Sequence, residues 1–322
     1  MSETNNHKRE AQLFGVAKKQ KLSRIQNEDF VLFSLARFGW LTSHQVAEIL
    51  WPQKPSGNDL SRRILSSLNS QSFVSFQIMT RSPGKQIKAF YLSTKGMNRV
   101  LENPDFKSLI KVKKTKRSIT DDKYQYHRLL SNQVLIDIRR ARLKLPFCDP
   151  DSGFVLMSEH EMRPYRKSIN AHLGCIPDGL VKVDSTMLVI EVENSVRGPA
   201  RHGSKLRQEG NKLEAWLPPY IERLRSQGRY SDHLLPLGKN GEYSDAKEIF
   251  VCTSEKIFRS IWRKMRGLLG QFNKETGYFY YIILNKQLWV DPLRSDNIQI
   301  LEHNSQEAVQ LVAVGEERTR RK

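Results

Sequence analysis

The stretch DFVLFSLARFGWLTSHQVAEILW, residues 29–51, predicts two helices joined almost without a loop. The first helix is expected to end near Gly39, and the second follows at once. Thr42 with Gln45 three residues later is the signature of a capping box at the start of the second helix. The apolar residues of that helix recur at the spacing of one buried face, and they are Val46, Ile49 and Leu50.

A third helix is predicted for residues 59–71, DLSRRILSSLNSQ, after a loop that contains proline and glycine. Asn58 is the expected N-cap, because its side chain can accept hydrogen bonds from the first free backbone amides. One face of this helix is apolar, with Leu60, Ile64, Leu65 and Leu68. Arg62 and Arg63 should therefore point away from the core.

The next residues, FVSFQIMTRSPGKQIKAFYLS (73–93), predict two strands around a turn at Ser82, Pro83 and Gly84. Basic residues gather near the tip of this hairpin: Arg81, Lys85 and Lys88. Three helices followed by a basic hairpin is the order of a winged helix, whose third helix enters the major groove while the hairpin meets the phosphate backbone. The alternatives are a small α+β subdomain without that role and, for the two arginines, a solvated helix face.

The composition favours a nucleic-acid partner. The 322 residues include 53 Lys and Arg against 34 Asp and Glu, a net charge of +19. Such an excess favours a polyanion, because binding releases condensed counterions. The three cysteines, Cys148, Cys175 and Cys252, lack the spacing of a zinc site or a disulfide framework. No apolar run is long enough to span a bilayer and no signal peptide is evident, so a soluble, cytoplasmic protein is expected.

The pattern along the chain predicts an α+β protein with two domains. A basic arm (1–24) precedes the winged helix (25–103), and a basic linker (104–122) follows it. The second domain (123–300) alternates a long amphipathic helix, three strands, a helix, a strand, a helix and a strand, which is typical of a mixed sheet covered by helices. A basic tail (301–322) ends the chain.

Within the second domain, IPDGLVKVDSTMLVIEVENS (176–195) predicts a hairpin that carries three acids. Side chains alternate along a strand, so Glu191 and Glu193 share one face. If Asp184 and Ser185 form a two-residue turn, counting back along both strands sets Asp178 directly opposite Glu191. Like charges that face each other are destabilising unless a cation lies between them.

A divalent cation, Mg²⁺ or Mn²⁺, is the natural occupant, because Mg²⁺ is commonly held by one or two carboxylates, waters and substrate phosphates. It would activate water for phosphodiester cleavage. The following predicted helix offers Lys205 or Lys212 to stabilise developing charge, and Lys205 is preferred as the closer to its start. Alternation along SEHEMRPYR puts Glu159 and Glu161 on one strand face, where either is a further ligand or an exposed strand-end acid.

The residues PDG, VIEVENS and a lysine on the next helix resemble the PD-(D/E)xK nuclease fold, over about residues 123–285. The order of winged helix, basic linker, YQYHRLL, SEHEMR, PDG and EVENS is similar to the replication-relaxation family and its MobC-type plasmid relaxases. This resemblance implies a restriction-endonuclease-like second domain. The family's usual lysine stands two residues after the glutamate, and this chain has Glu193 at that position.

The same resemblance implies metal-dependent, strand-specific nicking of supercoiled plasmid DNA at a transfer origin, with other mobilisation or coupling proteins as partners. It makes Asp178 and Glu191 metal ligands, Glu193 a third ligand or water-positioning base, and Lys205 the electrostatic stabiliser. Glu161 is the further candidate ligand. Two other functions fit the same residues. One is a non-catalytic replication initiator or transcription regulator, favoured by the missing lysine, and the other is an endonuclease that cuts both strands.

Overall fold

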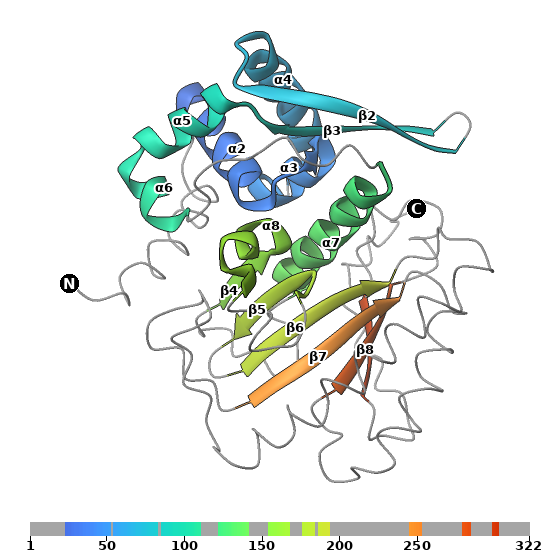
Figure 1. Ribbon diagram of the computed structural model, residues 1–322. Coiled ribbons are helices and arrows are strands. Elements are labelled where there is room, and N and C mark those ends of the chain that lie inside the picture. Colours follow the sequence, from blue (N-terminus) through green and yellow to red (C-terminus); the bar gives the residue numbers. More distant parts are fainter. Residues whose placement is uncertain are drawn as a thin grey trace. The chain divides into compact units, whose positions relative to one another are not determined.

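The computed structural model describes an α+β chain in two compact units, Met1–Ile136 with Met157–Tyr165 and Asp137–Leu156 with Arg166–Lys322 (Figure 1). The residues described are 23–52, 54–82, 85–110, 122–141, 154–167, 176–183, 186–193, 245–252, 279–284 and 298–302. The basic arm up to residue 22, the predicted helices near 200–217 and 255–272, and the tail beyond residue 302 lie outside them. None of the described helices is long and apolar enough to cross a membrane.

The first unit begins with the predicted order of three helices and a hairpin. Its elements are α2 (Arg24–Phe38), β1 (Leu41–Thr42), α3 (Ser43–Leu50), α4 (Gly57–Ser70), β2 (Val74–Ser82) and β3 (Lys85–Leu92). The three strands form one antiparallel sheet in the order β1-β3-β2. The last pair of the hairpin is Ser82 with Lys85. The pairing shifts by one residue between Thr80 and Ser82, which leaves Arg81 in a bulge.

Local side-chain hydrogen bonds fix the ends of α2 and α3. The hydroxyl of Thr42 accepts from the backbone N–H of Gln45 at 3.1 Å, and the Gln45 side chain accepts from the Thr42 N–H at 3.0 Å, which confirms the predicted capping box. Ser23 and Gln26 form the same box on α2, so that Arg24, expected in the basic arm, belongs to the first turn of this helix. Helix α2 ends as predicted at Gly39, whose φ of 76° is unfavourable for residues with a Cβ.

Helix α4 starts earlier than predicted. Its N-cap is Ser56, without a side-chain capping bond, and Asn58 lies inside the first turn. The prediction that Asn58 caps the helix is therefore wrong. The apolar face is as expected, since Ile64, Leu65 and Leu68 are buried, while Leu60 is half-buried.

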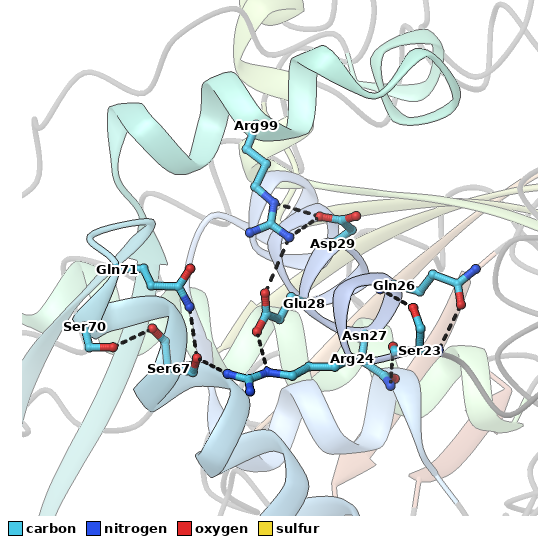
Figure 2. A network of polar contacts seen from close by, with 10 residues as sticks. All are labelled: Ser23, Arg24, Gln26, Asn27, Glu28, Asp29, Ser67, Ser70, Gln71 and Arg99. Carbon is cyan, nitrogen blue, oxygen red and sulfur yellow. Dashed lines mark hydrogen bonds and ion pairs between the residues drawn. The ribbon is translucent and has the colours of Figure 1, made fainter.

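Helix α2 is the centre of the first unit. Every residue from 30 to 38 is buried, as expected for a helix surrounded by other elements. Figure 2 shows how polar contacts tie its start to α4 and α5 (Thr94–Glu102). Arg24 donates to the Ser67 hydroxyl at 3.1 Å, and Arg99 contacts the carboxylates of Asp29 at 2.8 Å and Glu28 at 3.5 Å. The acids of α2 are thus neutralised by arginines at the edge of the core.

The hairpin is followed by two short helices, and the sequence pattern did not predict these helices. Besides α5, residues 104–109 of the expected linker form α6 (Pro104–Leu109). Its N-cap is Asn103, and Pro104 takes the first helical position, where its missing N–H costs nothing. Phe106 stacks on Phe33 with ring centroids 4.5 Å apart, so α6 is part of the apolar core.

The first unit also contains most of α7 (Asp122–Ala141) and a second segment of the chain. This segment holds the end of β4 (Phe154–Ser158), α8 (Glu159–Met162) and a 3-10 turn (Arg163–Tyr165). The sequence predicted a strand through Glu159 and Glu161. That prediction is wrong after Ser158, because the Ser158 side chain caps α8 and Glu161 completes a capping box.

The second unit is built on a mixed sheet in the order β4-β5-β6-β7-β8-β9. Its other strands are β5 (Gly179–Val183), β6 (Thr186–Glu193), β7 (Asp245–Cys252), β8 (Phe279–Leu284) and β9 (Ile298–Glu302). The pairs β6-β7 and β7-β8 are parallel, whereas β5-β6 and β8-β9 are antiparallel. The strands β4 to β8 match predicted segments. Strand β9 was not predicted and extends into the expected tail.

We predict that Phe106→Ala destabilises the first unit by about 3–5 kcal/mol, because the substitution leaves a cavity against Phe33. Hydrogen exchange of the α2 amides in the full chain measures the effect. Ile25→Ala is the control, since this side chain is 66% exposed and its loss should cost less than about 0.5 kcal/mol. Equal protection of α2 in both variants would show that α6 does not support the core.

Candidate functional site

Helix α4 presents a basic surface. Arg62 and Arg63 are exposed, on the side of the helix away from Ile64, Leu65 and Leu68, as predicted. Arg62 lies 3.7 Å from the carboxylate of Asp59, and both side chains are more than half exposed. Such surface pairs contribute little to stability, so Arg62 can exchange this partner for a phosphate or a base edge at small cost.

The hairpin carries one described basic side chain. Lys88 is exposed on β3, and its Nζ lies 3.6 Å from the ring centroid of Phe76. Arg81 and Lys85 lie in the strands on either side of the turn, and their side chains are outside the described part of the structure. The basic helix and the basic hairpin belong to one unit.

The acid-bearing hairpin has the predicted register. Val183 pairs with Thr186, and the pairing continues without a shift to Gly179 and Ile190. The ladder ends at this pair, and Asp178 lies in a bend directly before β5. Two hydrogen bonds fix this end of the hairpin: the Asp178 N–H donates to the Ile190 carbonyl at 2.9 Å, and the Val192 N–H donates to the Asp178 carboxylate at 2.7 Å. Asp178 is therefore bonded to the backbone on both sides of Glu191.

Burial separates the three acids. Asp178 and Glu191 are half-buried, whereas Glu193 is only 6% exposed. Val189, on the face of the two glutamates, is buried, and so are Ile190 and Val192 on the other face. Both faces of β6 are thus covered, and Glu193 is not a solvated strand-end acid. Asp178 and Glu191 are therefore the more exposed of the three acids.

Glu161 is engaged elsewhere. Its Oε1 accepts a hydrogen bond from Arg37 Nε at 2.6 Å, and its Oε2 accepts from the Ser158 N–H at 3.0 Å. Both side chains of this ion pair are buried in the first unit. Because both carboxylate oxygens already accept strong hydrogen bonds, these contacts do not favour Glu161 as a metal ligand.

The other residues of SEHEMR also have structural partners. The Glu159 carboxylate accepts from Tyr124 Oη and from Arg128 Nη2, the latter at 3.0 Å. Burial, then the charges of Arg128 and Arg163, lowers the pKa of His160 from 6.5 to about 3, so the ring is neutral at physiological pH. It lies so close to Gly39 that a Cβ there would come within 2.9 Å of its Cγ.

Sequence reasoning did not predict that Arg37, Arg128 and Arg163 contact Glu159 and Glu161. Arg37 in the mainly apolar run of residues 30–38 was a signal, because a buried arginine requires an acidic partner. The motif S-x-x-E at Ser158 and Glu161 was a second signal, since it marks a helix start. Within the described part of the chain no group of three or more His, Cys, Asp or Glu side chains is suited to a metal ion. Lys205 and Lys212 lie outside the described residues.

Comparison with known proteins adds little to this geometry. No protein-family model matches the chain, and no curated protein sequence matches it. Among solved structures, the crystal structure of Bacillus subtilis PadR in complex with operator DNA is similar at 13% identity. The match covers 62% of this chain and 96% of the PadR chain, with a TM-score of 0.21. A likeness at this level decides neither the fold nor the function.

We predict that Glu161→Gln destabilises the first unit by about 3 kcal/mol, because it removes the buried charge that faces Arg37. Chemical denaturation of the full chain measures the loss, and Mn²⁺ titration of the folded variant should match the native protein. Asp59→Asn is the control, since its side chain is 70% exposed. Native stability combined with weaker Mn²⁺ binding would instead assign Glu161 to a metal site.

Proposed function

We propose that this chain binds duplex DNA through a winged helix formed by α2 to β3, with α4 in the major groove. The order of the elements, the exposed Arg62 and Arg63, and the exposed Lys88 support this role. The net charge of +19 supports it as well, because phosphate neutralisation drives such binding. Guanidinium groups on α4 suit base edges in the major groove, whereas the hairpin lysines suit the backbone.

We further propose that the second unit is a restriction-endonuclease-like domain that nicks the bound DNA in a metal-dependent reaction, as in plasmid relaxases. The observation that supports this proposal is the end of the hairpin, where Asp178 is hydrogen-bonded to the backbone of Ile190 and Val192, the two neighbours of Glu191. Two neighbouring carboxylates in a basic chain suit Mg²⁺ or Mn²⁺ together with a DNA phosphate.

In this mechanism the protein's role is to hold the cation and to orient the carboxylates that bind it. The Val192 N–H fixes one oxygen of Asp178, so that the carboxylate keeps its orientation without a rotamer search. Glu191 supplies the second carboxylate from the facing strand. A divalent cation bound by the two would activate a water and stabilise the leaving oxygen. Lys205 is the proposed electrostatic stabiliser, and Glu193, buried beside the pair, is proposed to orient groups in the site.

A second function has its own support. Glu193 occupies the place of the lysine that the nuclease motif expects, and the described residues contain no three-ligand group. Both observations favour a DNA-binding initiator or regulator whose second unit has no catalytic role. Calorimetry separates the two functions, since Mn²⁺ binding that is lost in Asp178→Ala supports the nuclease, and absence of binding in the native protein supports the regulator.

For the nuclease we predict that Asp178→Ala and Glu191→Ala each abolish Mg²⁺- or Mn²⁺-dependent nicking of supercoiled plasmid that carries the cognate origin. Duplex binding should remain, because α4 lies in the other unit. Agarose gels follow the conversion to open circles, and Glu102→Ala, which removes an exposed acid of the first unit, is the control. Linear product would indicate cleavage of both strands, and full nicking by both variants would refute the proposed site.

For DNA reading we predict that Arg62→Ala or Arg63→Ala reduces discrimination between cognate and random duplex by roughly 1–3 kcal/mol, if the residue contacts a guanine. Lys88→Ala should instead weaken binding to all sequences and lower the salt dependence by about one counterion. Fluorescence anisotropy at several salt concentrations measures both quantities. Unchanged discrimination in both arginine variants would exclude α4 as the reading helix.

A further inference from the structure

One face of the β2-β3 hairpin carries large apolar side chains into solvent. Phe76 is 38% exposed and Ile78 is 50% exposed. Alternation puts both on the face of Val74, which is 1% exposed and belongs to the core. The row of apolar side chains therefore runs out of the core along the hairpin, which Figure 1 shows extending beyond the helices of its unit.

A basic side chain, that of Lys88, lies within this exposed face. Lys88 pairs with Ile78 across the hairpin, and its Nζ is 3.6 Å from the centroid of the Phe76 ring and 5.2 Å from that of Phe90. The sequence of both strands and their turn, residues 74–92, has three basic residues and no Asp or Glu. We call Phe76, Ile78 and Lys88 the hairpin strip.

The opposite face of the hairpin is already covered. Met79 and Ala89 are buried there, and Gln77 accepts a hydrogen bond from the Gln125 side chain of α7 at 2.9 Å. The strip is thus the face of these strands that can receive another molecule. Ile25 is the one other large apolar side chain that is exposed among the described residues, and it lies at the start of α2.

We propose that the hairpin strip binds unpaired nucleotides of a DNA strand, with a base against the Phe76 ring and Ile78, and a phosphate at Lys88. The chemistry of the strip selects this occupant. Aromatic and apolar side chains beside cations bind single strands, because every unpaired base has an exposed π face. A closed duplex presents mainly phosphates to a hairpin, and contacts to phosphates use polar and basic side chains rather than phenylalanine.

This inference rests on the proposed DNA-binding function and deepens it. Cleavage of one strand at a defined position is easier where the duplex is locally open, and a strip for unpaired bases on the DNA-binding unit would keep such a region open. The basic face of α4 then serves paired DNA, Phe76 and Ile78 serve unpaired bases, and Lys88 can contact a phosphate of either, within one unit.

The test is anisotropy of the full chain in EDTA with a labelled oligothymidine and, separately, with a duplex of random sequence. Phe76→Ala should weaken oligothymidine binding by at least about fivefold, the lower end of the effect of removing one stacked base. Phe76→Trp should retain binding, because the indole also stacks. Lys88→Gln should lower the salt dependence of oligothymidine binding by about 0.7 in log–log slope.

Ile25→Ala is the matched control for loss of an exposed apolar side chain, and it should bind oligothymidine normally. Equal oligothymidine binding by Phe76→Ala and the native chain overturns the proposal. So does a change of molar mass in Phe76→Ala by light scattering without a change in oligothymidine binding, which would make the strip an interface between copies. The binding assay contains EDTA and no metal, so its result does not depend on the nicking reaction that Asp178→Ala tests. The hairpin strip and the nuclease site can therefore be refuted independently of each other.

Discussion

The buried ion pair between Arg37 and Glu161 joins helix α2 to a segment from later in the chain, and the first unit depends on this contact. Residues 157–165 belong to this unit, although the chain on both sides of them belongs to the other. Among the described residues, an ion pair and hydrogen bonds hold the segment against α2. Glu161 binds Arg37 at 2.6 Å, and the Ser158 hydroxyl donates to the Arg37 carbonyl at 2.5 Å. One residue at the end of α2 therefore anchors the segment through both its side chain and its backbone.

Further polar contacts join α7 to the same core. The side chain of Asn132 donates to the carbonyls of Phe38 and Trp40 at 3.2 and 2.7 Å, and that of Gln45 donates to the Leu129 carbonyl at 2.7 Å. The two Asn132 bonds satisfy carbonyls where α2 ends and β1 begins, which a short connection would otherwise leave without partners, and the Gln45 bond joins α3 to α7. A helix that the sequence pattern assigned to the second domain thus completes the first unit.

Acids and bases are used differently in the interior and at the surface of this basic chain. Glu28, Asp29, Glu159 and Glu161 each contact arginines at the edge of the core or within it. Arg62, Arg63 and Lys88 remain exposed on α4 and the hairpin. Among the described residues, the arginines of the core thus have acidic partners, whereas these three basic side chains face solvent and can meet a polyanion.

The sequence was most informative where one local rule determines geometry. The turn length set the register of β5 and β6, and the Thr42 box set the start of α3, because each depends on a few neighbouring residues. It failed where two rules competed. The residues SEHEM alternate like a strand, yet Ser158 and Glu161 also form a capping box. Arg37, the partner of Glu161 that favours the helix, is 124 residues away from it in the sequence. Such distant charge partners are invisible to periodicity.

The acidic hairpin shows why its local geometry could nevertheless be predicted. The bond from the Val192 N–H to the Asp178 carboxylate exists only in the observed register, because a slip by one residue would put Asp178 beside a different amide and move Glu191 to the other face. Buried Val189, Ile190 and Val192 resist such a slip. The same apolar packing that specifies the strand pair therefore also fixes the hydrogen bond that holds the Asp178 carboxylate beside Val192.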